Sequence, residues 1–334
     1  MIHPAPHSIR IGPRRLNEIA IELTSKCNLQ CRMCSVWKGR KDGLPFGNIK
    51  DLLAEARGLG ARVFVPFGAE IFMRKDTIAI LEAACELGFH TIPIVSNGML
   101  VARHVDRLAK IDGLSLGISI DGPEHVHDAL RGAGSYRAAL VGLDTALAAG
   151  IAVSLKGVLM RNTIDSAAHL IELARSKGIP QVSFQPFQPE IAGAGEDHSE
   201  WAFPPCDRDR VDDALSALLD TARLAGVQVF TEGLFSKITP YLFDRHRPIP
   251  PGGCHLPSRF LMISWRGETF PCFFMRGQSL GNVAKGLRLR DIWHGALQQE
   301  MQARGLAGAC PGCLASCSDL PSFNASKPQL AAQT

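Results

Sequence analysis

The feature that most constrains the fold of this chain is a regular alternation of short β-branched apolar runs with amphipathic segments, from Ile19 to about Phe230. Several runs are almost continuously apolar, as is typical of strands that are covered on both faces of a parallel sheet. Because helical periodicity follows most runs, the pattern predicts an α/β fold whose parallel sheet rolls into a full or partial barrel. The expected strands are 19–23, 62–67, 90–95, 114–120, 151–159 and 181–187, with a weaker one at 227–230.

Capping residues and terminal glycines indicate the limits of the helices between these strands. The expected helices begin at Asn48 and end at Gly58 or Gly60, run from Asp76 to Gly88 and from Ser135 to Gly150, and span 163–177 and 207–225. In barrels of such units, functional side chains gather where the strands run into the following loops. Those strand ends are therefore where functional residues are expected.

The sequence changes character after Thr231. A stretch rich in proline and glycine at 248–253 breaks the alternation. Beyond it, the segments 260–265 and 268–273 predict a hairpin, 289–304 predicts a helix, and a cysteine-rich end follows. We expect an N-terminal extension over 1–15, a barrel over 16–235, a small hairpin-plus-helix domain over 236–320, and a disordered tail over 321–334.

Composition excludes several classes of protein. With 46% apolar and 20% charged residues the chain can build an ordinary core. It has no apolar run of roughly 18 residues and no secretory signal at its start, and a net charge of +4 does not indicate nucleic acid or a membrane as partner. We therefore expect a cytoplasmic protein with reduced thiols, whose ten cysteines bind metal rather than form disulfides.

Three of these cysteines, Cys27, Cys31 and Cys34, follow the first strand with the spacing C-x3-C-x2-C. A mononuclear zinc site normally takes four ligands, and no fourth Cys or His follows nearby. A four-iron cluster held by three cysteines leaves one iron with an open coordination position. The spacing favours such a cluster; a zinc loop that borrows a distant ligand, or plain structural thiols, are the alternatives.

With this motif the chain resembles the radical S-adenosylmethionine (radical SAM) enzymes over about residues 15–230. The resemblance implies a partial (β/α)6 TIM-like barrel and a [4Fe-4S] cluster whose open iron is chelated by S-adenosylmethionine. In the family, an electron delivered to the cluster, here from a donor such as flavodoxin or ferredoxin, cleaves the sulfonium. The resulting 5′-deoxyadenosyl radical abstracts hydrogen from the substrate.

The resemblance also implies a set of cofactor-binding residues at the strand ends. Gly68, Ala69 and Glu70 stand where the family usually has Gly-Gly-Glu beside the methionine amino group, so Ala69 is a mild departure. Other residues resemble positions that meet the ribose or the methionine carboxylate, although ordinary Asn-Gly and Asp-Gly turns explain each alone. These residues are Ser96, Asn97, Ser119 and Asp121.

Four further candidates are less specific. Arg131 is placed to pair with the cofactor carboxylate, or else is an exposed arginine at a helix start. Trp37 resembles an aromatic residue near the adenine, with plain packing as the alternative. Lys156 and Gln185 are expected at the same rim from their positions on the fifth and sixth strands.

A second group of cysteines lies near the C-terminus: Cys254, Cys272, Cys310, Cys313 and Cys317. It resembles the auxiliary-cluster extensions called SPASM and twitch domains. Two auxiliary clusters would need eight ligands, so the resemblance implies one auxiliary [4Fe-4S] cluster, with either Cys313 or Cys317 completing its ligands. Zinc is the alternative occupant.

Two cysteines stand outside these groups. Cys85 is expected to be a small buried hydrophobe within a helix. Cys206 follows the sixth strand and could donate hydrogen to a substrate radical, or be an ordinary loop cysteine.

The resemblance therefore implies a radical SAM enzyme of oxidoreductase or epimerase type. Residues 1–15 are too few for the peptide-binding domain of many relatives, so we expect a small polar substrate, such as a carbohydrate or aminocyclitol, that is dehydrogenated or epimerised. The auxiliary cluster would accept an electron or anchor the substrate. The alternatives are a maturase that crosslinks or epimerises a ribosomal peptide, and a zinc-stabilised binding protein without activity.

Overall fold

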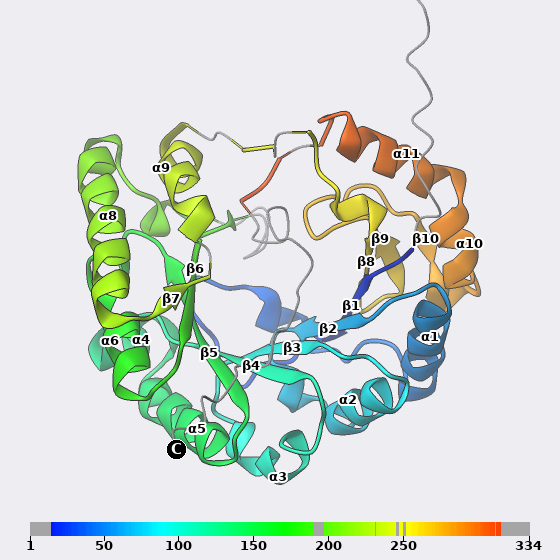
Figure 1. The fold of residues 1–334 in the computed structure, drawn as a ribbon, viewed down its shortest axis with the longest axis horizontal. Coiled ribbons are helices and arrows are strands. Elements are labelled where there is room, and N and C mark those ends of the chain that lie inside the picture. The colour runs from blue at the N-terminus through cyan, green and yellow to red at the C-terminus, as the bar shows by residue number, and fades with distance from the viewer. Residues whose placement is uncertain are drawn as a thin grey trace, which may run out of the picture.

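The computed structural model describes residues 15–189, 197–230, 232–244, 247–249, 252–310 and 312–314. Within these residues, Figure 1 shows strands arranged in an arc with helices around its outer side. The residues before Arg15, the expected C-terminal tail and Cys317 lie outside the described residues. No helix in the described part of the chain is long and apolar enough to cross a membrane.

The strands form two five-stranded sheets that meet edge to edge, in the orders β10-β9-β8-β1-β2 and β3-β4-β5-β6-β7. A single parallel bridge between Val63 and Thr91 joins β2 to the chain entering β3. The predicted partial barrel is confirmed, with β1 to β7 running parallel within each sheet. The strands are β1 Glu18–Thr24, β2 Val63–Gly68, β3 Ile92–Ser96, β4 Leu114–Ser119, β5 Ala152–Leu159, β6 Gln181–Pro186, β7 Gln228–Val229, β8 Phe260–Ile263, β9 Glu268–Phe270 and β10 Gly281–Asn282.

Helices cover the outer face of the arc (Figure 1). Apolar side chains from alternate strand positions pack against these helices. On β5, for example, Val153, Leu155 and Leu159 are buried on this outer side, while Ser154 and Lys156 face the barrel interior. The helices are α1 Phe46–Gly58, α2 Thr77–Glu86, α3 Val105–Leu108, α4 Glu124–Arg131, α5 Ser135–Ala148, α6 Ala168–Ser176, α8 Arg208–Ala225, α9 Phe235–Asp244, α10 Leu289–His294 and α11 Ala296–Leu306.

The C-terminal hairpin joins the barrel, which was not predicted. Strand β8 pairs in parallel with β1, from Glu18 opposite Phe260 to Ile21 opposite Ile263, and β9 returns antiparallel beside it. Helix α10 is fixed to the barrel as well, because Glu55 on α1 accepts hydrogen bonds from the Arg288 side chain at 2.5 Å and from the Leu289 N–H at 2.8 Å. The hairpin and the barrel therefore share one hydrogen-bonded sheet.

Some expected helix limits were wrong. The first helix begins at Phe46 rather than Asn48, and the helix expected over 163–177 starts as a 3-10 turn, Ile164–Ser166, before α6. The helix expected over 289–304 is two helices, because the backbone of Gly295 is extended there (ψ 155°). Helix α4 was not predicted.

Candidate functional site

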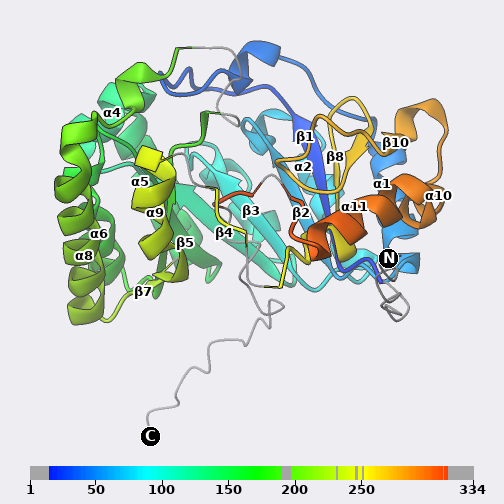
Figure 2. The ribbon, with the colours of Figure 1, turned by 90° about the horizontal axis from the view of Figure 1, so that it is seen from above.

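A cavity of about 360 Å³ lies at the carboxyl ends of the barrel strands. The loop after β1 contributes Cys27, Cys31 and Cys34 to its wall, and Figure 2 shows this loop lying across one end of the barrel. The cavity brings together eight of the predicted cofactor residues: Trp37, Gly68, Ala69, Ser96, Asn97, Ser119, Arg131 and Gln185. Glu70, Asp121, Lys156 and Cys206 are not among its lining residues.

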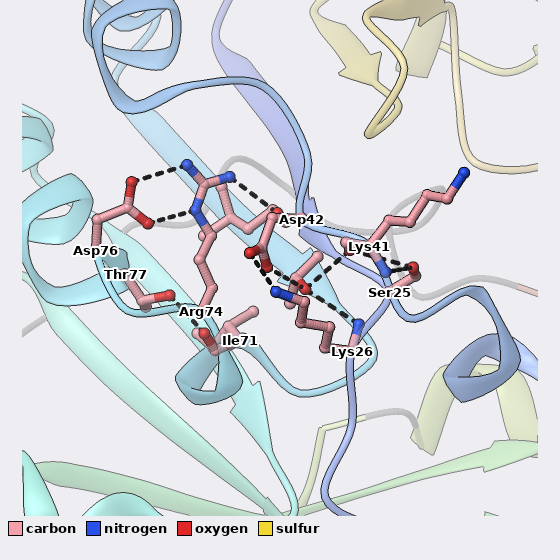
Figure 3. A network of polar contacts seen from close by, with 10 residues as sticks. Ser25, Lys26, Lys41, Asp42, Ile71, Arg74, Asp76 and Thr77 are labelled. Carbon is pink, nitrogen blue, oxygen red and sulfur yellow. Dashed lines mark hydrogen bonds and ion pairs between the residues drawn. The ribbon is translucent and has the colours of Figure 1, made fainter.

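The start of the cysteine loop is held in place by a polar network that Figure 3 shows from close by. The Thr24 hydroxyl donates to the Asp42 carboxylate at 2.9 Å and accepts from the Lys26 N–H at 3.0 Å. The Lys26 ammonium also forms an ion pair with the Asp42 carboxylate at 2.5 Å. The Ser25 N–H donates to the Lys41 carbonyl at 2.8 Å, and the Ser25 hydroxyl accepts from the Lys41 N–H at 3.0 Å. These bonds fix the segment before Cys27 to residues 41–42.

A second part of this network fixes the end of β1 from below the loop. The Arg74 guanidinium donates to the Leu23 carbonyl at 3.0 Å and pairs with Asp76 at 2.5 Å (Figure 3). Asp76 was expected to cap α2 through its side chain, but its carboxylate binds Arg74 instead. The loop that carries the three cysteines thus departs from a rigid strand end.

The three thiols of the cysteine loop line the cavity together. Among the described residues, no group of three or more His, Cys, Asp or Glu side chains could hold one metal ion. Cys27, Cys31 and Cys34 all line the same cavity, and cysteine thiolates are the usual ligands of iron–sulfur clusters. Burial raises the pKa of the Cys27 thiol and raises that of Cys31 to about 11, so these thiols ionise readily only when a cation is bound to them.

Glu70, which was expected to meet the cofactor, is not among the residues that line the cavity. Its buried carboxylate accepts from the Asn97 N–H at 2.9 Å, from the Phe72 N–H at 3.3 Å and from the Ser96 hydroxyl at 3.1 Å. Burial raises the pKa of Glu70, and the two backbone donors oppose the rise. Glu70 therefore positions Ser96 and Asn97, which do line the cavity.

Asp121 positions Arg131, as Glu70 positions Ser96 and Asn97. The Arg131 Nε donates to the Asp121 carboxylate at 2.6 Å, and the side chains are 11% and 0% exposed. Arg131 lies at the end of α4, not at a helix start, and its guanidinium is the buried cation beside the cavity thiols. Burial raises the pKa of Cys27 and Cys31, and the charge of Arg131 opposes this rise, which favours thiolate ligands.

The cavity wall between these polar groups is apolar, which the sequence analysis did not predict. Val95 on β3 is 54% exposed although it lies in a strand, because it faces this cavity. Phe67 and Phe187 lie at the ends of the neighbouring strands. The strand alternation at Val95 could have indicated an inward-facing position, but not that an open cavity lies there.

Gln188 was also missed. It lines the cavity, its amide nitrogen donates to the Leu314 carbonyl at 3.4 Å, and its buried Oε1 has no hydrogen-bond partner among the described residues. This contact connects the end of β6 to the segment that follows Cys313.

The C-terminal thiols Cys254, Cys272, Cys310 and Cys313 gather in a second place. The hydrogen bond between Cys254 and Cys310 raises the pKa of Cys254 and lowers that of Cys310 to about 6. Burial, with smaller contributions from the nearby Cys310 and Cys313, raises the pKa of Cys272 to about 12. Four thiols on separate segments thus approach one another, as one cluster requires.

Close backbone packing brings Cys254 to this place. The Cys254 N–H donates to the Gly305 carbonyl at the end of α11 at 2.8 Å. Gly253 has a φ of +86°, and a Cβ there would lie 2.4 Å from the Leu306 carbonyl oxygen. A larger residue at 253 would therefore push the Cys254 segment away from α11.

The two remaining cysteines lie apart from both thiol groups. Cys85 is half-buried in α2 and packs against the core, as expected. Cys206 lies exposed in the 3-10 turn Pro205–Asp207 before α8 and does not line the cavity. This placement gives no support to the expected role as a hydrogen donor.

Two family models match the chain. A model of the radical SAM superfamily matches residues 21–183, and a model of the SPASM iron–sulfur cluster-binding domain matches residues 254–317.

Among curated proteins, the chain is 29% identical to Fe-coproporphyrin III synthase of Methanosarcina barkeri over 186 residues, which are 53% of this chain and 46% of that protein. It is 22% identical to AdoMet-dependent heme synthase of the same organism, over 87% of each chain. It is 27% identical to the mycofactocin maturase MftC of Mycobacterium tuberculosis, over 94% of this chain and 80% of that protein. The chain thus spans about half of the first of these relatives and most of the other two.

Among solved structures, Streptococcus suis SuiB bound to the precursor peptide SuiA has a TM-score of 0.66 at 17% identity, covering 87% of this chain and 67% of that one. The structure of anSMEcpe with bound AdoMet has a TM-score of 0.67 at 14% identity, covering 87% and 81%. At these identities the likeness shows a shared fold.

Proposed function

This chain belongs to the radical SAM superfamily and carries a SPASM domain, and we propose that it is a maturase that modifies a peptide held over the cavity beside Cys27, Cys31 and Cys34. The observation that carries the proposal is that one cavity is lined both by these thiols and by polar residues at the ends of three strands, β3, β4 and β6. The chain is a radical SAM enzyme whose cofactors are [4Fe-4S] clusters and S-adenosylmethionine.

The three cavity cysteines would hold the cluster that binds S-adenosylmethionine. When bound, these groups supply a 5′-deoxyadenosyl radical that takes a hydrogen atom from the substrate. Arg131, fixed by Asp121, would offer its guanidinium to the cofactor carboxylate. Ser96 and Asn97, fixed by Glu70, would meet the polar part of the cofactor, and Trp37, whose indole N–H donates to the Cys34 carbonyl at 2.7 Å, would lie near the adenine.

The walls of the cavity favour a peptide over the carbohydrate or aminocyclitol expected from the sequence. Val65, Phe67, Val95 and Phe187 present apolar surface to the space beside the thiols. A sugar hydroxyl buried against these apolar side chains would lack a hydrogen-bond partner, at a cost of about 1–3 kcal/mol. An apolar amino-acid side chain loses no hydrogen bond by contact with them.

The comparisons support the same choice. One of the relatives matched over most of this chain, MftC, is named a mycofactocin maturase, whereas another is named a heme synthase. Two structures with the same fold were solved with peptides, SuiB with SuiA and anSMEcpe with the Cp18Cys peptide. We propose that Cys254, Cys272, Cys310 and Cys313 hold one auxiliary cluster, which would accept the second electron of an oxidation or anchor the peptide. An electron donor such as flavodoxin or ferredoxin would supply the cluster that cleaves S-adenosylmethionine.

The proposal is tested with protein reconstituted anaerobically with iron and sulfide. We expect about eight iron atoms per chain, an EPR signal that changes when S-adenosylmethionine is added, and 5′-deoxyadenosine formation with dithionite. Short peptides encoded beside the gene should accelerate this cleavage and change in mass, whereas a matched panel of carbohydrates and aminocyclitols should not. Acceleration by the carbohydrate panel alone would overturn the peptide proposal, and zinc without iron would favour the binding-protein alternative.

A further inference from the structure

A second cavity, of about 600 Å³, lies next to the cavity at the three thiols, which we call the cysteine cavity. Phe187, which follows β6, lines both cavities, so the two share a wall. Other walls come from the 3-10 turn Ser199–Trp201 and the residues after it, from α9 and from Arg247. The volume lies within the range of about 300–1,000 Å³ that is usual for ligand pockets.

Aromatic side chains recur around this second cavity, which we call the aromatic cavity: Phe187, Trp201, Phe203 and Tyr241 line it. The first three are held by their own packing, at 8%, 3% and 9% exposed. The rings of Phe187 and His198 lie edge to face, with their centroids 5.3 Å apart. Rings that are already fixed lose little freedom when a ligand binds, and they offer the edges and faces that a further aromatic ring prefers.

Trp201 connects the aromatic cavity to the cysteine loop. The guanidinium of Arg32, which follows Cys31, lies over the Trp201 ring at 5.4 Å from its centroid and pairs with the Glu200 carboxylate. The Arg161 N–H donates to the Trp201 carbonyl at 3.1 Å, which fixes the turn to the chain after β5. The aromatic cavity therefore has a fixed place beside the loop that carries the three cysteines.

The charges around the aromatic cavity disfavour a cationic ligand. Aromatic rings can bind ammonium and guanidinium groups over their faces, but Arg32 already lies over the Trp201 ring, and Arg247 lines the cavity. No Asp or Glu is among the described residues that line it. A lysine or arginine side chain of a substrate would meet positive charge there without a carboxylate to offset it, whereas a neutral ring would meet no such repulsion.

From these contacts we infer that the aromatic cavity binds an aromatic side chain of the substrate peptide. Because Phe187 separates the two cavities, a residue anchored on one side of its ring places a neighbouring residue of the peptide in the cysteine cavity. The anchored residue is thus distinct from the one that loses hydrogen. This inference rests on the proposed function, and it names a type of residue that the peptide must carry.

Labelling of His198, which also lines the aromatic cavity, tests binding without turnover. The reconstituted holoenzyme, saturated with S-adenosylmethionine, is pulse-labelled with diethyl pyrocarbonate. The rate at His198 is read by peptide mass spectrometry, with the exposed His90 as the internal reference. The probes are acetyl-Gly-Phe-Gly-amide and the matched peptides with leucine or arginine in the middle, so that they differ in one side chain only.

We expect the phenylalanine probe to slow labelling of His198 about tenfold once it reaches ten times its Kd, with no effect at His90. The leucine probe should bind about three- to tenfold more weakly, because it makes no contacts between aromatic rings, and the arginine probe should not protect. Equal protection by the leucine or the arginine probe, or none by the phenylalanine probe, would overturn the inference. Full protection by S-adenosylmethionine alone would overturn it as well, because the cavity would then belong to the cofactor.

Variants separate the aromatic cavity from other apolar surface. Tyr241→Leu keeps an apolar side chain on α9 but removes a ring, and should weaken binding of the phenylalanine probe about three- to tenfold by calorimetry. Phe46→Leu is the matched control, because Phe46 is another half-buried aromatic residue packed against the core but lines neither cavity. The same affinity in Tyr241→Leu and in the control would contradict the assignment.

The outcomes also distinguish this inference from the proposed function. If the phenylalanine probe protects His198 as expected but no peptide is modified, the side-chain site stands and the peptide proposal fails. If a peptide is modified, we expect the change of one of its aromatic residues to leucine to raise KM with kcat nearly unchanged. A KM that is unchanged when each aromatic residue is replaced in turn would leave the peptide proposal standing and overturn this inference.

Discussion

Glu70 at the end of β2 and Asn97 at the end of β3 are joined by a hydrogen bond of 2.9 Å from the Asn97 N–H to the Glu70 carboxylate. The two strands belong to different five-stranded sheets, which a β-bridge between Val63 and Thr91 also joins. This buried carboxylate therefore adds a link between the two sheets at the end where the cavity opens. Its hydrogen bonds position Ser96 and Asn97, which line the cavity.

We expect Glu70→Gln to destabilise the protein by about 1–3 kcal/mol, because an amide nitrogen would face the N–H of Asn97 or Phe72. The same change should weaken S-adenosylmethionine binding, since Ser96 and Asn97 would shift. Urea unfolding and the Kd for the cofactor measure the two effects. Glu86→Gln, on the exposed end of α2, is the matched control. Unchanged stability in Glu70→Gln would show that the carboxylate does not link the strands.

A second pair, Arg131 and Asp121, predicts a separable effect on cofactor affinity. Arg131→Gln should raise the Kd for S-adenosylmethionine at least about tenfold, because a charge-assisted hydrogen bond contributes about 1.5–3 kcal/mol. Asp121→Asn leaves the guanidinium in place but unpaired, so it should destabilise the fold by about 3–5 kcal/mol. Arg137→Gln, which removes an exposed ion pair with Glu124, is the control. Equal affinity in Arg131→Gln and the control would exclude contact with the cofactor.

Much of the barrel could be predicted because its strands are almost wholly apolar and alternate regularly with amphipathic helices along the chain. The cysteine spacing predicted the position of the candidate site for a similar reason, since it is local in the chain. The pairing of β8 with β1 could not be predicted, because it joins residues that are far apart in sequence and no local pattern records it.

The directions of the side chains at the strand ends could not be predicted from the sequence either. The motif containing Glu70 and the motif containing Asp121 both lie at strand ends, so both were expected to face the cofactor. In the structure their carboxylates bind Asn97 and Arg131, which line the cavity, and are not themselves among its lining residues. A short motif indicates which strand end carries polar groups, but the packing of neighbouring strands decides which of them reaches the cavity.

The two groups of cysteines, one at the cavity and one near the C-terminus, should have separate functions. Cys27→Ala, Cys31→Ala and Cys34→Ala should each abolish S-adenosylmethionine cleavage, because each removes a ligand of the cluster that binds it. Cys272→Ala should reduce the iron content from about eight to about four atoms per chain, spare abortive cleavage and remove product. Iron analysis and 5′-deoxyadenosine formation measure this, with Cys85→Ala as the control thiol. Loss of cleavage in both sets would contradict the division.

Cys206→Ala should leave product formation unchanged. The thiol is exposed in the turn before α8 and does not line the cavity, so it has no path to a substrate radical there. The measurement is turnover with a modified peptide in deuterated buffer, where a thiol donor would deliver solvent deuterium to the product. Loss of turnover together with loss of deuterium incorporation would restore Cys206 as a hydrogen donor.

His127 should make the stability of the apoprotein depend on pH. Its buried ring accepts the Asp121 N–H at 3.3 Å, and burial lowers the pKa of His127 to about 4, with the charge of Arg131 adding to the effect. In the unfolded chain the pKa is near 6.5, so the unfolded state binds a proton first as the pH falls. The contribution of the neutral ring is therefore complete above pH 6.5 and is lost progressively between about pH 6.5 and 4, by about 3 kcal/mol in total.

Urea unfolding of the apoprotein across this pH range measures the effect against His127→Gln, which keeps a side-chain acceptor but does not titrate. The difference in unfolding free energy between the two should shrink as the pH falls, whereas the exposed His90→Gln control should parallel the parent protein. Because His127 fixes the backbone of Asp121, and Asp121 fixes Arg131, cofactor affinity should decline only near pH 4, where the ring of the folded protein takes up a proton. A parent protein whose pH profile matched that of His127→Gln would show that the ring is not held neutral.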